Sequence, residues 1–173
     1  MVRRAVVLIA LLLFGCMQRS EEVEQIGALG ISSPAFENMG MIPGRYTCDG
    51  EDVNPPLVFT GIPSGTASLA LIVEDPDAPL GTFDHWIVWN IPVVNGIAEN
   101  SVPDGAVQGR NGFGRNSYNG PCPPHGSMHK YIFKLYALNA SLELPAGATK
   151  SELENAMRGK VVAQTQIAGK YER

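Results

Sequence analysis

The stretch that decides the fold is Gly120-Pro-Cys-Pro-Pro-His-Gly-Ser-Met-His-Lys-Tyr131, which runs directly into the apolar segment 132–138. Its three prolines and two glycines indicate a rigid loop with few free backbone donors. Segment 132–138 is predicted to continue as a strand, and His129 and Tyr131, two residues apart, then share one face of it. A stiff loop that delivers polar side chains to the start of a strand predicts a small binding site.

The second half of that site is predicted in Asp75-Pro-Asp-Ala-Pro79 and in Asp84-His-Trp86, which lie next to two further apolar runs. Residues 68–74 and 85–91 are almost continuously apolar, which is typical of central strands buried on both faces. We expect these two strands and 131–138 to pair as the core of one sheet. Strict alternation in the second run would place on one face His85, Ile87, Trp89 and Ile91, and on the other Trp86, Val88 and Asn90.

Composition and turn signals favour one β-rich domain. The chain has 173 residues, 45% of them hydrophobic, and its 19 glycines and 13 prolines are spread as turns and not as repeats. The capping box Thr149-Lys-Ser-Glu152 predicts one helix that ends near Gly159, and 161–171 alternates as a final strand. The expected fold is mainly β, a β-sandwich with one or two short peripheral helices.

The first residues indicate an export signal. Arg3 and Arg4 precede the apolar run 5–14, which is too short to span a bilayer and has the order of a secretory signal. Leu13-Phe-Gly-Cys16 resembles the lipobox of prokaryotic lipoproteins, in which the cysteine is lipidated; the alternatives are a plain cleaved signal and an uncleaved anchor. The predicted division is a signal peptide over 1–15, a tether over 16–26 that begins with the lipidation site Cys16, and a domain over 27–173. The domain is expected to be exported, either anchored to the cell membrane or secreted.

The charge of the mature chain disfavours some partners. Without Arg3 and Arg4, 11 basic residues face 17 acidic ones, a net charge of −6. Nucleic-acid binding depends on cationic contacts to phosphate, so no nucleic-acid partner is expected. A broad attraction to anionic lipid headgroups is disfavoured for the same reason. A phosphate-like ligand would therefore have to be held locally, within a pocket.

Two cysteines, Cys48 and Cys122, remain once Cys16 is assigned to the leader. An even number in an oxidising compartment favours a disulfide, which would connect loop 46–50 to the proline-rich loop. The alternative is two thiols that lie near each other, because bonding requires Cα atoms within about 7 Å.

The ionisable candidates for the site are Asp75, Asp77, Asp84, His85, His125 and His129. Two histidines and two aspartates can satisfy zinc, but no HxxxH or CxxC spacing occurs, so neither a metal nor another cofactor is expected. A nucleophilic hydrolase is disfavoured because no serine lies in a G-x-S-x-G motif, and we expect no enzyme activity. Imidazoles donate hydrogen bonds and a neighbouring carboxylate favours their charged form, so recognition of a phosphate or carboxylate group is the favoured chemistry.

Residues 95–128 are rich in glycine, asparagine, proline and serine, and a long loop in a compact domain is more often functional than idle. The glycines of 109–118 follow no strong strand and open no helix, which disfavours a dinucleotide-binding motif. We expect this loop to form a wall or a lid of the pocket.

Two motifs resemble the signatures of the phosphatidylethanolamine-binding protein family, the Raf kinase inhibitor-like proteins. Asp75-Pro-Asp-Ala-Pro79 with His85-Trp-Ile-Val-Trp-Asn90 resembles the first signature, and Gly120-Pro-Cys-Pro-Pro124 with His129-Lys-Tyr131 resembles the second. Tyr46-Thr-Cys-Asp-Gly50 with Asn54-Pro-Pro-Leu57 resembles the prokaryotic branch. The likeness covers 29–171 and has both motifs in the family's order.

This resemblance implies an antiparallel β-sandwich with a small pocket for phosphate-like anions. It implies that the pocket is lined by Asp75, His85, His129 and Tyr131, that its rim is shaped by Pro79, Gly120 and Pro121, and that the Asp75 loop is oriented by Asp77. A cis peptide bond is expected at Ala78–Pro79, since cis bonds are plausible only before proline. Prokaryotic relatives are often dimers, so a homodimer is a further expectation.

The predicted function is that of an exported, membrane-tethered binding protein. It would hold a small anion such as phosphate, a phosphoethanolamine-like group or a carboxylate, without catalysis. The alternative is an inhibitor of a serine protease or a kinase that acts through the loops at the pocket rim. Export favours a protease target over a cytosolic kinase, and 108–120 is the candidate reactive loop. A weak hydrolase is the third hypothesis.

Overall fold

The strand β3 (Ser68–Asp75) lies at the centre of the larger sheet, and all eight of its residues are buried. A continuously apolar strand has no face for water, so it must be covered on both sides. It pairs with β4 (Phe83–Ile91) along one edge and with β7 (Met128–Leu138) along the other, as the sequence predicts. The computed structural model describes residues 28–173; the predicted signal peptide, the predicted lipidation site Cys16 and the predicted tether lie outside the described residues.

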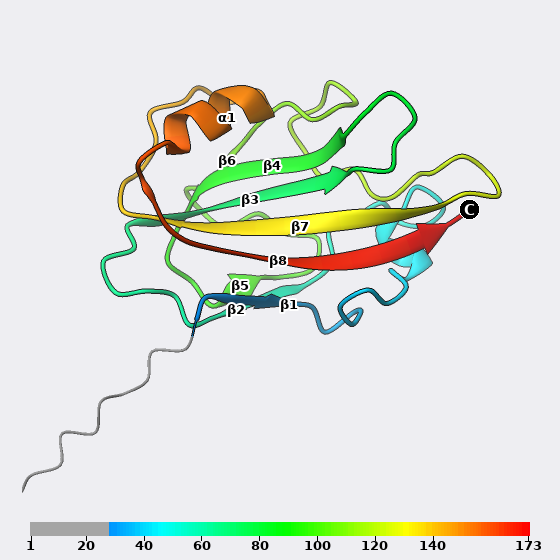
Figure 1. Ribbon diagram of the computed structural model, residues 1–173, viewed down its shortest axis with the longest axis horizontal. Helices are drawn as coiled ribbons and strands as arrows, with labels where there is room; N and C mark the ends of the chain where they lie inside the picture. Colours follow the sequence, from blue (N-terminus) through cyan, green and yellow to red (C-terminus); the bar gives the residue numbers. More distant parts are fainter. Residues whose placement is uncertain (1–27) are drawn as a thin grey trace, which may run out of the picture.

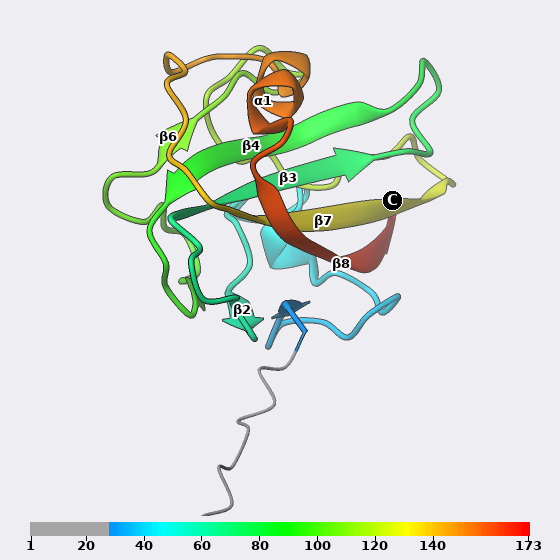
Figure 2. The same ribbon diagram turned by 60° about the vertical axis from the view of Figure 1, so that its left-hand side comes forward.

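Two antiparallel sheets form a sandwich, which confirms the expected fold class (Figures 1 and 2). The larger sheet has the order β6-β4-β3-β7-β8, with β6 at Val107–Gln108 and β8 at Val161–Glu172. The smaller sheet has the order β1-β2-β5, and its strands are Gly30–Ser32, Leu57–Thr60 and Gly96–Ile97. The main core fills the space between the sheets and includes Trp86, Phe133 and Phe59.

One α-helix, α1 (Lys150–Met157), covers the outer face of the larger sheet and forms a third layer above β4 in Figure 1. Its capping box is present, because Thr149 N–H donates to Glu152 Oε2 at 2.7 Å and Glu152 N–H donates back to Thr149 Oγ1. Leu153 and Met157 pack with Ile72 and Trp89 beneath the helix. The other helical segment in the described part of the chain is the short 3-10 turn Gly44–Tyr46. Within 28–173, no helix is long and apolar enough to cross a membrane.

Two β-bulges in β4 make the predicted alternation of its side chains wrong. Val73 pairs with Trp86 but Glu74 pairs with Asp84, so His85 is an extra residue in the strand. A bulge of this kind changes which face the following side chains occupy, and His85 comes to lie against Tyr131 on the inner side, with ring centroids 5.2 Å apart.

The second bulge lies near the other end of β4. Leu71 pairs with Val88 and Leu69 with Ile91, so this segment also contains one extra residue. Asn90 adopts a φ of 53°, in the left-handed region that asparagine tolerates better than most residues. Ile91 therefore joins Trp86 and Val88 in the inner core instead of Trp89 on the outer face.

Candidate functional site

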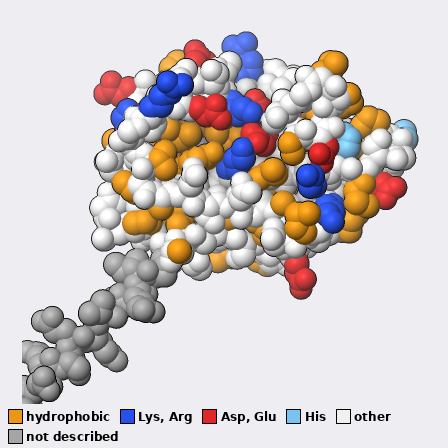
Figure 3. Space-filling view, in the orientation of Figure 1, with side chains coloured by type: hydrophobic (Ala, Val, Ile, Leu, Met, Phe, Trp, Pro, Cys, Tyr) orange, Lys and Arg blue, Asp and Glu red, His pale blue; other side chains and the backbone are white. Residues whose placement is uncertain are grey.

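The site lies where β3 ends and β7 begins, at the right in Figure 1, and the histidines visible in Figure 3 lie at the same end. Asp75 is the last residue of β3, His129 is the second of β7, and both are buried. The two side chains are joined by a hydrogen bond of 2.7 Å between His129 Nδ1 and Asp75 Oδ2. A carboxylate only accepts, so Nδ1 carries the proton and Nε2 is the nitrogen left to meet a ligand.

The loop after β3 is held by two backbone donors. Asp77 N–H donates to Asp75 Oδ1 at 2.8 Å, and Lys130 N–H donates to Asp77 Oδ2 at 2.9 Å. Asp77 thus connects this loop to the start of β7. The structure places Asp77 where it orients Asp75, in the position that the family resemblance implies.

His85 reaches the same region because of the first bulge in β4. Its Nδ1–H donates to the carbonyl of Asn119 at 2.8 Å, and the residue is 3% exposed. Burial lowers the pKa of His85, although the Asn119 carbonyl and the Asp75 carboxylate act in the opposite direction. Near pH 7 the ring is therefore neutral, and its Nε2 is an acceptor.

Tyr131 packs edge-on against the His85 ring with its hydroxyl buried. Burial, together with the charge of Asp75, raises the pKa of Tyr131, so the hydroxyl keeps its proton. The Cys122 backbone and Asp75 are close enough to influence this pKa, yet the hydroxyl forms no hydrogen bond of good geometry with a described residue. Buried hydroxyls are normally paired, so this one is a candidate donor to a ligand.

A hollow of about 320 Å³ opens among these elements. Its ionisable lining consists of Asp75, His85, His129 and Arg173. The rest of the lining is mainly apolar: Ala78, Pro79, Phe83, Phe113, Cys122, Pro123 and Pro124. This is a small apolar pocket with a few convergent polar groups, the usual character of a small-molecule site.

Several predicted residues lie outside the lining, Tyr131 and Asp77 among them. Gly120 and Pro121 are behind the wall: Gly120 N–H donates to Asp52 Oδ1 at 2.6 Å, and the Pro121 carbonyl accepts from Cys48 N–H at 3.1 Å. A Cβ on Gly120 would lie 2.1 Å from the Tyr46 carbonyl oxygen, so close packing requires glycine there.

Two ionisable candidates are also away from the hollow. Asp84 forms an ion pair with Lys150 at 2.8 Å, and His125 is exposed. Among residues 28–173, no three His, Cys, Asp or Glu side chains are grouped so that they could hold a metal ion.

The expectation of a cis bond at Ala78–Pro79 is wrong for this structure, in which the described peptide bonds are all trans. The chain reverses here by other means. Besides the Asp77–Asp75 bond, Gly81 N–H donates to the Ala78 carbonyl at 3.1 Å, and Gly81 adopts a φ of 101°. These turns bring Pro79 to the hollow without a cis bond.

The sequence reasoning missed Asn111, which organises the long loop beside the hollow. Its Nδ2 donates to the Ser117 carbonyl at 2.9 Å and to Asn119 Oδ1 at 2.8 Å. Its Oδ1 accepts from the backbone N–H groups of Phe113 and Arg115. Phe113 is thereby held against the hollow, so the loop forms a wall, as the sequence predicts. Asparagine in a Gly-rich segment is a turn signal, but nothing in the pattern singles out this hub.

A disulfide joins Cys48 to Cys122, with Cα atoms 5.4 Å apart. It connects the loop after the 3-10 turn to the wall of the hollow. Arg173, which the sequence reasoning also missed, lies beside it, with Nη1 at 3.5 Å from Cys122 Sγ. No sequence signal marks an arginine just beyond the last strand as a pocket residue.

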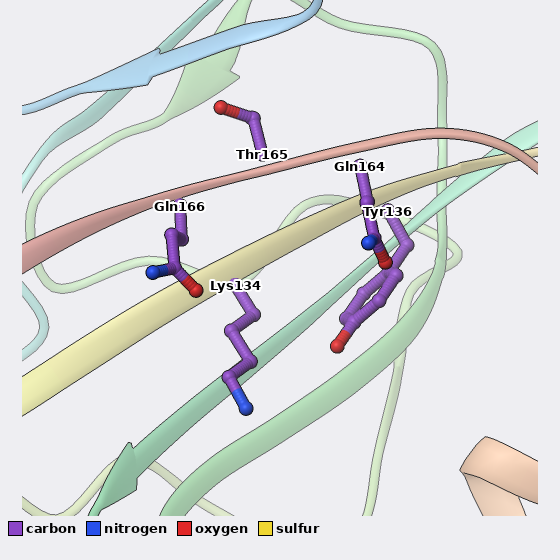
Figure 4. Close-up of a pocket in the computed structure, with 5 residues that line it drawn as sticks. All are labelled: Lys134, Tyr136, Gln164, Thr165 and Gln166. Carbon is purple, nitrogen blue, oxygen red and sulfur yellow. The ribbon is translucent and has the colours of Figure 1, made fainter.

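A second hollow of about 370 Å³ lies on the outer side of β7 and β8 (Figure 4). It is lined by Lys134, Tyr136, Gln164, Thr165 and Gln166, and in the figure Thr165 points away from the other four. The Lys134 amine is already paired with Glu74. This hollow is slightly larger but lacks the convergent imidazoles, so we place the site at the first hollow.

Comparison with known proteins agrees with this fold. The family model described as phosphatidylethanolamine-binding protein matches residues 32–172. The UPF0098 protein PH1269 of Pyrococcus horikoshii is 49% identical over 167 residues, which cover 92% of this chain and 82% of that protein. The chain belongs to the phosphatidylethanolamine-binding protein family.

Two solved structures are also similar. The homologue CT736 from Chlamydia trachomatis has a TM-score of 0.81 and 41% identity, over 84% of this chain and 98% of that one. Escherichia coli YbcL, described as a member of the mammalian family, has a TM-score of 0.79 and 30% identity, over 85% and 99%.

Proposed function

We propose that this protein binds a small phosphate-like or carboxylate anion, such as a phospholipid headgroup, in the hollow beside Asp75. The observation that supports this is the convergence of the two imidazoles of His85 and His129, which come from different strands. Both have their Nδ1 fixed by an acceptor, so both present Nε2. The volume of about 320 Å³ fits a headgroup-sized ligand and not a whole lipid.

The expected negative charge of the ligand follows from the hydrogen bonds that a protonated imidazole can donate. A protonated Nε2–H donates to an oxyanion, whereas a neutral Nε2 only accepts. An anion in the hollow therefore favours protonation, and protonation favours the anion. Affinity for phosphate should rise as pH falls through the histidine range.

The proposed role is binding without turnover. Among the described residues that line the hollow there is no serine, and the sulfur of Cys122 is held in the disulfide. A covalent mechanism would need an activated nucleophile next to a base. This lining therefore supports a binding protein more than a hydrolase.

The proposed location is the outer surface of a membrane, with residues 1–15 as a signal peptide and Cys16 lipidated. This part of the proposal is supported by the sequence pattern alone. Mass spectrometry of the protein from its native membrane would test it. A chain that begins at Cys16 and carries acyl groups is the expected result, and an unmodified Met1 would refute it.

Titration calorimetry with inorganic phosphate and phosphoethanolamine tests the binding proposal. The wild type should bind more tightly at about pH 6 than at pH 7.5, on either side of the usual histidine pKa. His129→Ala and His85→Ala should each weaken binding about tenfold or more, the scale of one lost charged hydrogen bond. His125→Ala, which removes an exposed histidine outside the lining, is the matched control. Unchanged affinity in both pocket variants would end the proposal.

A second candidate function, inhibition of a serine protease, is favoured by the loop around Asn111. Residues 112–116 are exposed, yet they are held by the hydrogen bonds of Asn111, so the loop is both accessible and rigid. Phe113, 47% exposed, would be the residue presented to an enzyme of chymotrypsin-like specificity. Incubation with chymotrypsin should give stoichiometric inhibition that Phe113→Asp abolishes; ordinary digestion of the loop would refute it.

A further inference from the structure

Arg173 is the one side chain in the lining whose charge does not depend on pH. Asp75, His85 and His129 complete the ionisable lining. Asp75 is anionic and accepts from His129, and burial keeps His85 neutral near pH 7. Guanidinium is protonated at all physiological pH values. Without Arg173, the hollow would present a carboxylate and an imidazole acceptor to an incoming anion.

The guanidinium of Arg173 is held in place by a neighbouring carboxylate. Its Nε lies 3.0 Å from Asp49 Oδ1, and the other oxygen of Asp49 accepts from the Tyr171 hydroxyl at 2.9 Å. Asp49 adjoins Cys48, so the disulfide to Cys122 fixes this pair beside the hollow. Figure 1 shows the end of β8 next to the start of β7, at the same end of the sheet as the loops.

Most hydrogen-bonding capacity of Arg173 remains unused. Guanidinium has five N–H donors, and the contact of Arg173 with Asp49 is an ion pair through Nε. Nη1 lies 3.5 Å from Cys122 Sγ, a weak acceptor. The side chain is about one-third exposed. The Nη hydrogens can therefore meet two oxygens of one ligand group, the arrangement that guanidinium makes with carboxylates and phosphates.

A lysine next to the site in sequence is directed elsewhere. Lys130 is next to His129 in sequence, but its Nζ lies 3.8 Å from Asp77 Oδ1 and it is absent from the lining. A lysine would in any case present a point charge without the planar fork.

We propose that Arg173 is the specificity-determining cation of this site, and that it selects ligands whose anionic group offers two coplanar oxygens, a phosphate or a carboxylate. This inference rests on the proposed function and adds the residue that carries affinity at neutral pH. The imidazoles then adjust affinity as pH falls, whereas Arg173 contributes at every pH.

The test is calorimetry at about pH 7.5, above the ordinary histidine pKa, where the imidazoles contribute least charge. Three probes are used: inorganic phosphate, phosphoethanolamine and a soluble short-chain phosphatidylethanolamine. Arg173→Gln should weaken binding of each probe at least tenfold, and Arg173→Lys should be intermediate because it keeps the charge alone. Arg158→Gln, an equal charge change at the end of α1, is the matched control. A lipid source is indicated if the short-chain lipid binds more tightly than inorganic phosphate, and a free phosphate source if the order is reversed.

The results separate this inference from the proposed function. If the wild type binds none of the probes, the proposed function fails and the role of Arg173 fails with it. A different outcome is that the wild type binds and that His129→Ala weakens binding but Arg173→Gln does not. The binding site is then supported, but Arg173 is not its specificity-determining cation. Thermal unfolding of each variant shows whether it folds; should Arg173→Gln be unfolded, wild-type affinity in Arg173→Lys would overturn the requirement for a planar fork.

Discussion

Tyr131 carries a buried hydroxyl that makes no hydrogen bond of good geometry with the described residues, although it lies close to Asp75 and the ring of His85. Folding removes this group from water without replacing its hydrogen bonds, which disfavours the folded state. A protein can retain such a group when the group acts on a ligand. In Tyr131 the ring packs in the core and the hydroxyl is a candidate donor to a ligand, so a substitution can separate the two roles.

Tyr131→Phe should leave the free energy of unfolding unchanged or raise it by up to about 1 kcal/mol, because the ring packing is kept and an unpaired hydroxyl is removed. Phosphate affinity should fall several-fold in the same variant, since the donor is lost. Urea unfolding and calorimetry measure the two quantities. A clear loss of stability would show that the hydroxyl is paired in the folded protein, and wild-type affinity would exclude it from recognition.

Burial of His85 makes stability depend on pH. Its pKa is lower in the folded protein than in the unfolded chain, so the unfolded chain binds more protons. The stability from this group is fully present above the unfolded pKa of about 6.5 and is lost as pH falls from there through the folded pKa. Glu74 acts at lower pH. Burial raises the pKa of Glu74, but Lys134 and Lys150 outweigh burial, so the pKa is lowered overall. The stability that Glu74 contributes is therefore lost as pH falls below about 4.5.

His85→Asn tests this assignment, because an amide can still donate to the Asn119 carbonyl but does not titrate. The melting temperature of the wild type should fall between about pH 6.5 and pH 4.5, the window between the ordinary pKa values of histidine and glutamate, and the variant should show a shallower fall. Parallel slopes over that window would show that another group causes the acid sensitivity.

At the scale of elements, the strand pattern could be read from the sequence and the bulges could not. Segments 68–74 and 131–138 have strand length, and β3 and β7 appear there. β3 is almost continuously apolar because it is buried on both faces, whereas buried and partly exposed residues alternate along most of β7. A bulge adds one residue without changing composition. His85 can therefore be identified as a site candidate from the sequence, although simple alternation groups it with Ile87 and Trp89, which pack under α1 instead.

The sequence likewise predicts some residues of the candidate site and not others. Asp75 and His129 could be identified because each adjoins a recognisable strand in a motif. Arg173 could not, because its role arises from contacts between segments far apart in the chain. Asn111 could not either, because its hydrogen bonds lie within one loop whose sequence pattern does not single it out. Gly120 and Pro121 were placed at the rim, but they pack behind the wall, since adjacency in sequence does not decide which side of a loop faces a hollow.

A substitution of Asn90 tests how the second bulge in β4 is stabilised. Its side chain exchanges two hydrogen bonds with the backbone of Leu142, at 2.9 and 2.8 Å, while its φ is positive. Asn90→Ala should lower the free energy of unfolding by about 2–3 kcal/mol, from two lost hydrogen bonds and left-handed strain in a residue less suited to it. Phosphate affinity should stay near wild type because Asn90 is at the opposite end of β4 from His85. Unchanged stability in urea unfolding would contradict this account of the bulge.

At the scale of the whole molecule, the hollow depends on loops that the sheets alone do not fix. Its walls come from the segments after β3, around Asn111 and before β7, and each is held by a few side-chain contacts. Asp52 binds the Gly120 backbone, and the disulfide joins the same two regions of the chain. These links act together, so loosening one should change both stability and ligand affinity.

Removal of the disulfide is the corresponding prediction. Cys48 and Cys122 are 74 residues apart, and closing a loop of this length in the unfolded chain is expected to contribute about 4 kcal/mol. Cys48→Ser/Cys122→Ser should therefore unfold at a markedly lower temperature, and wild-type protein treated with a reductant should match it. Phosphate affinity should fall as well, because Asp49 then no longer holds Arg173 beside the hollow. Two results together would contradict this account: a double variant that keeps the wild-type melting temperature, and a thiol assay on unreduced wild type that finds Cys48 and Cys122 both free. The bond would then not form in the protein, and the position of Arg173 would depend on its ion pair with Asp49 alone.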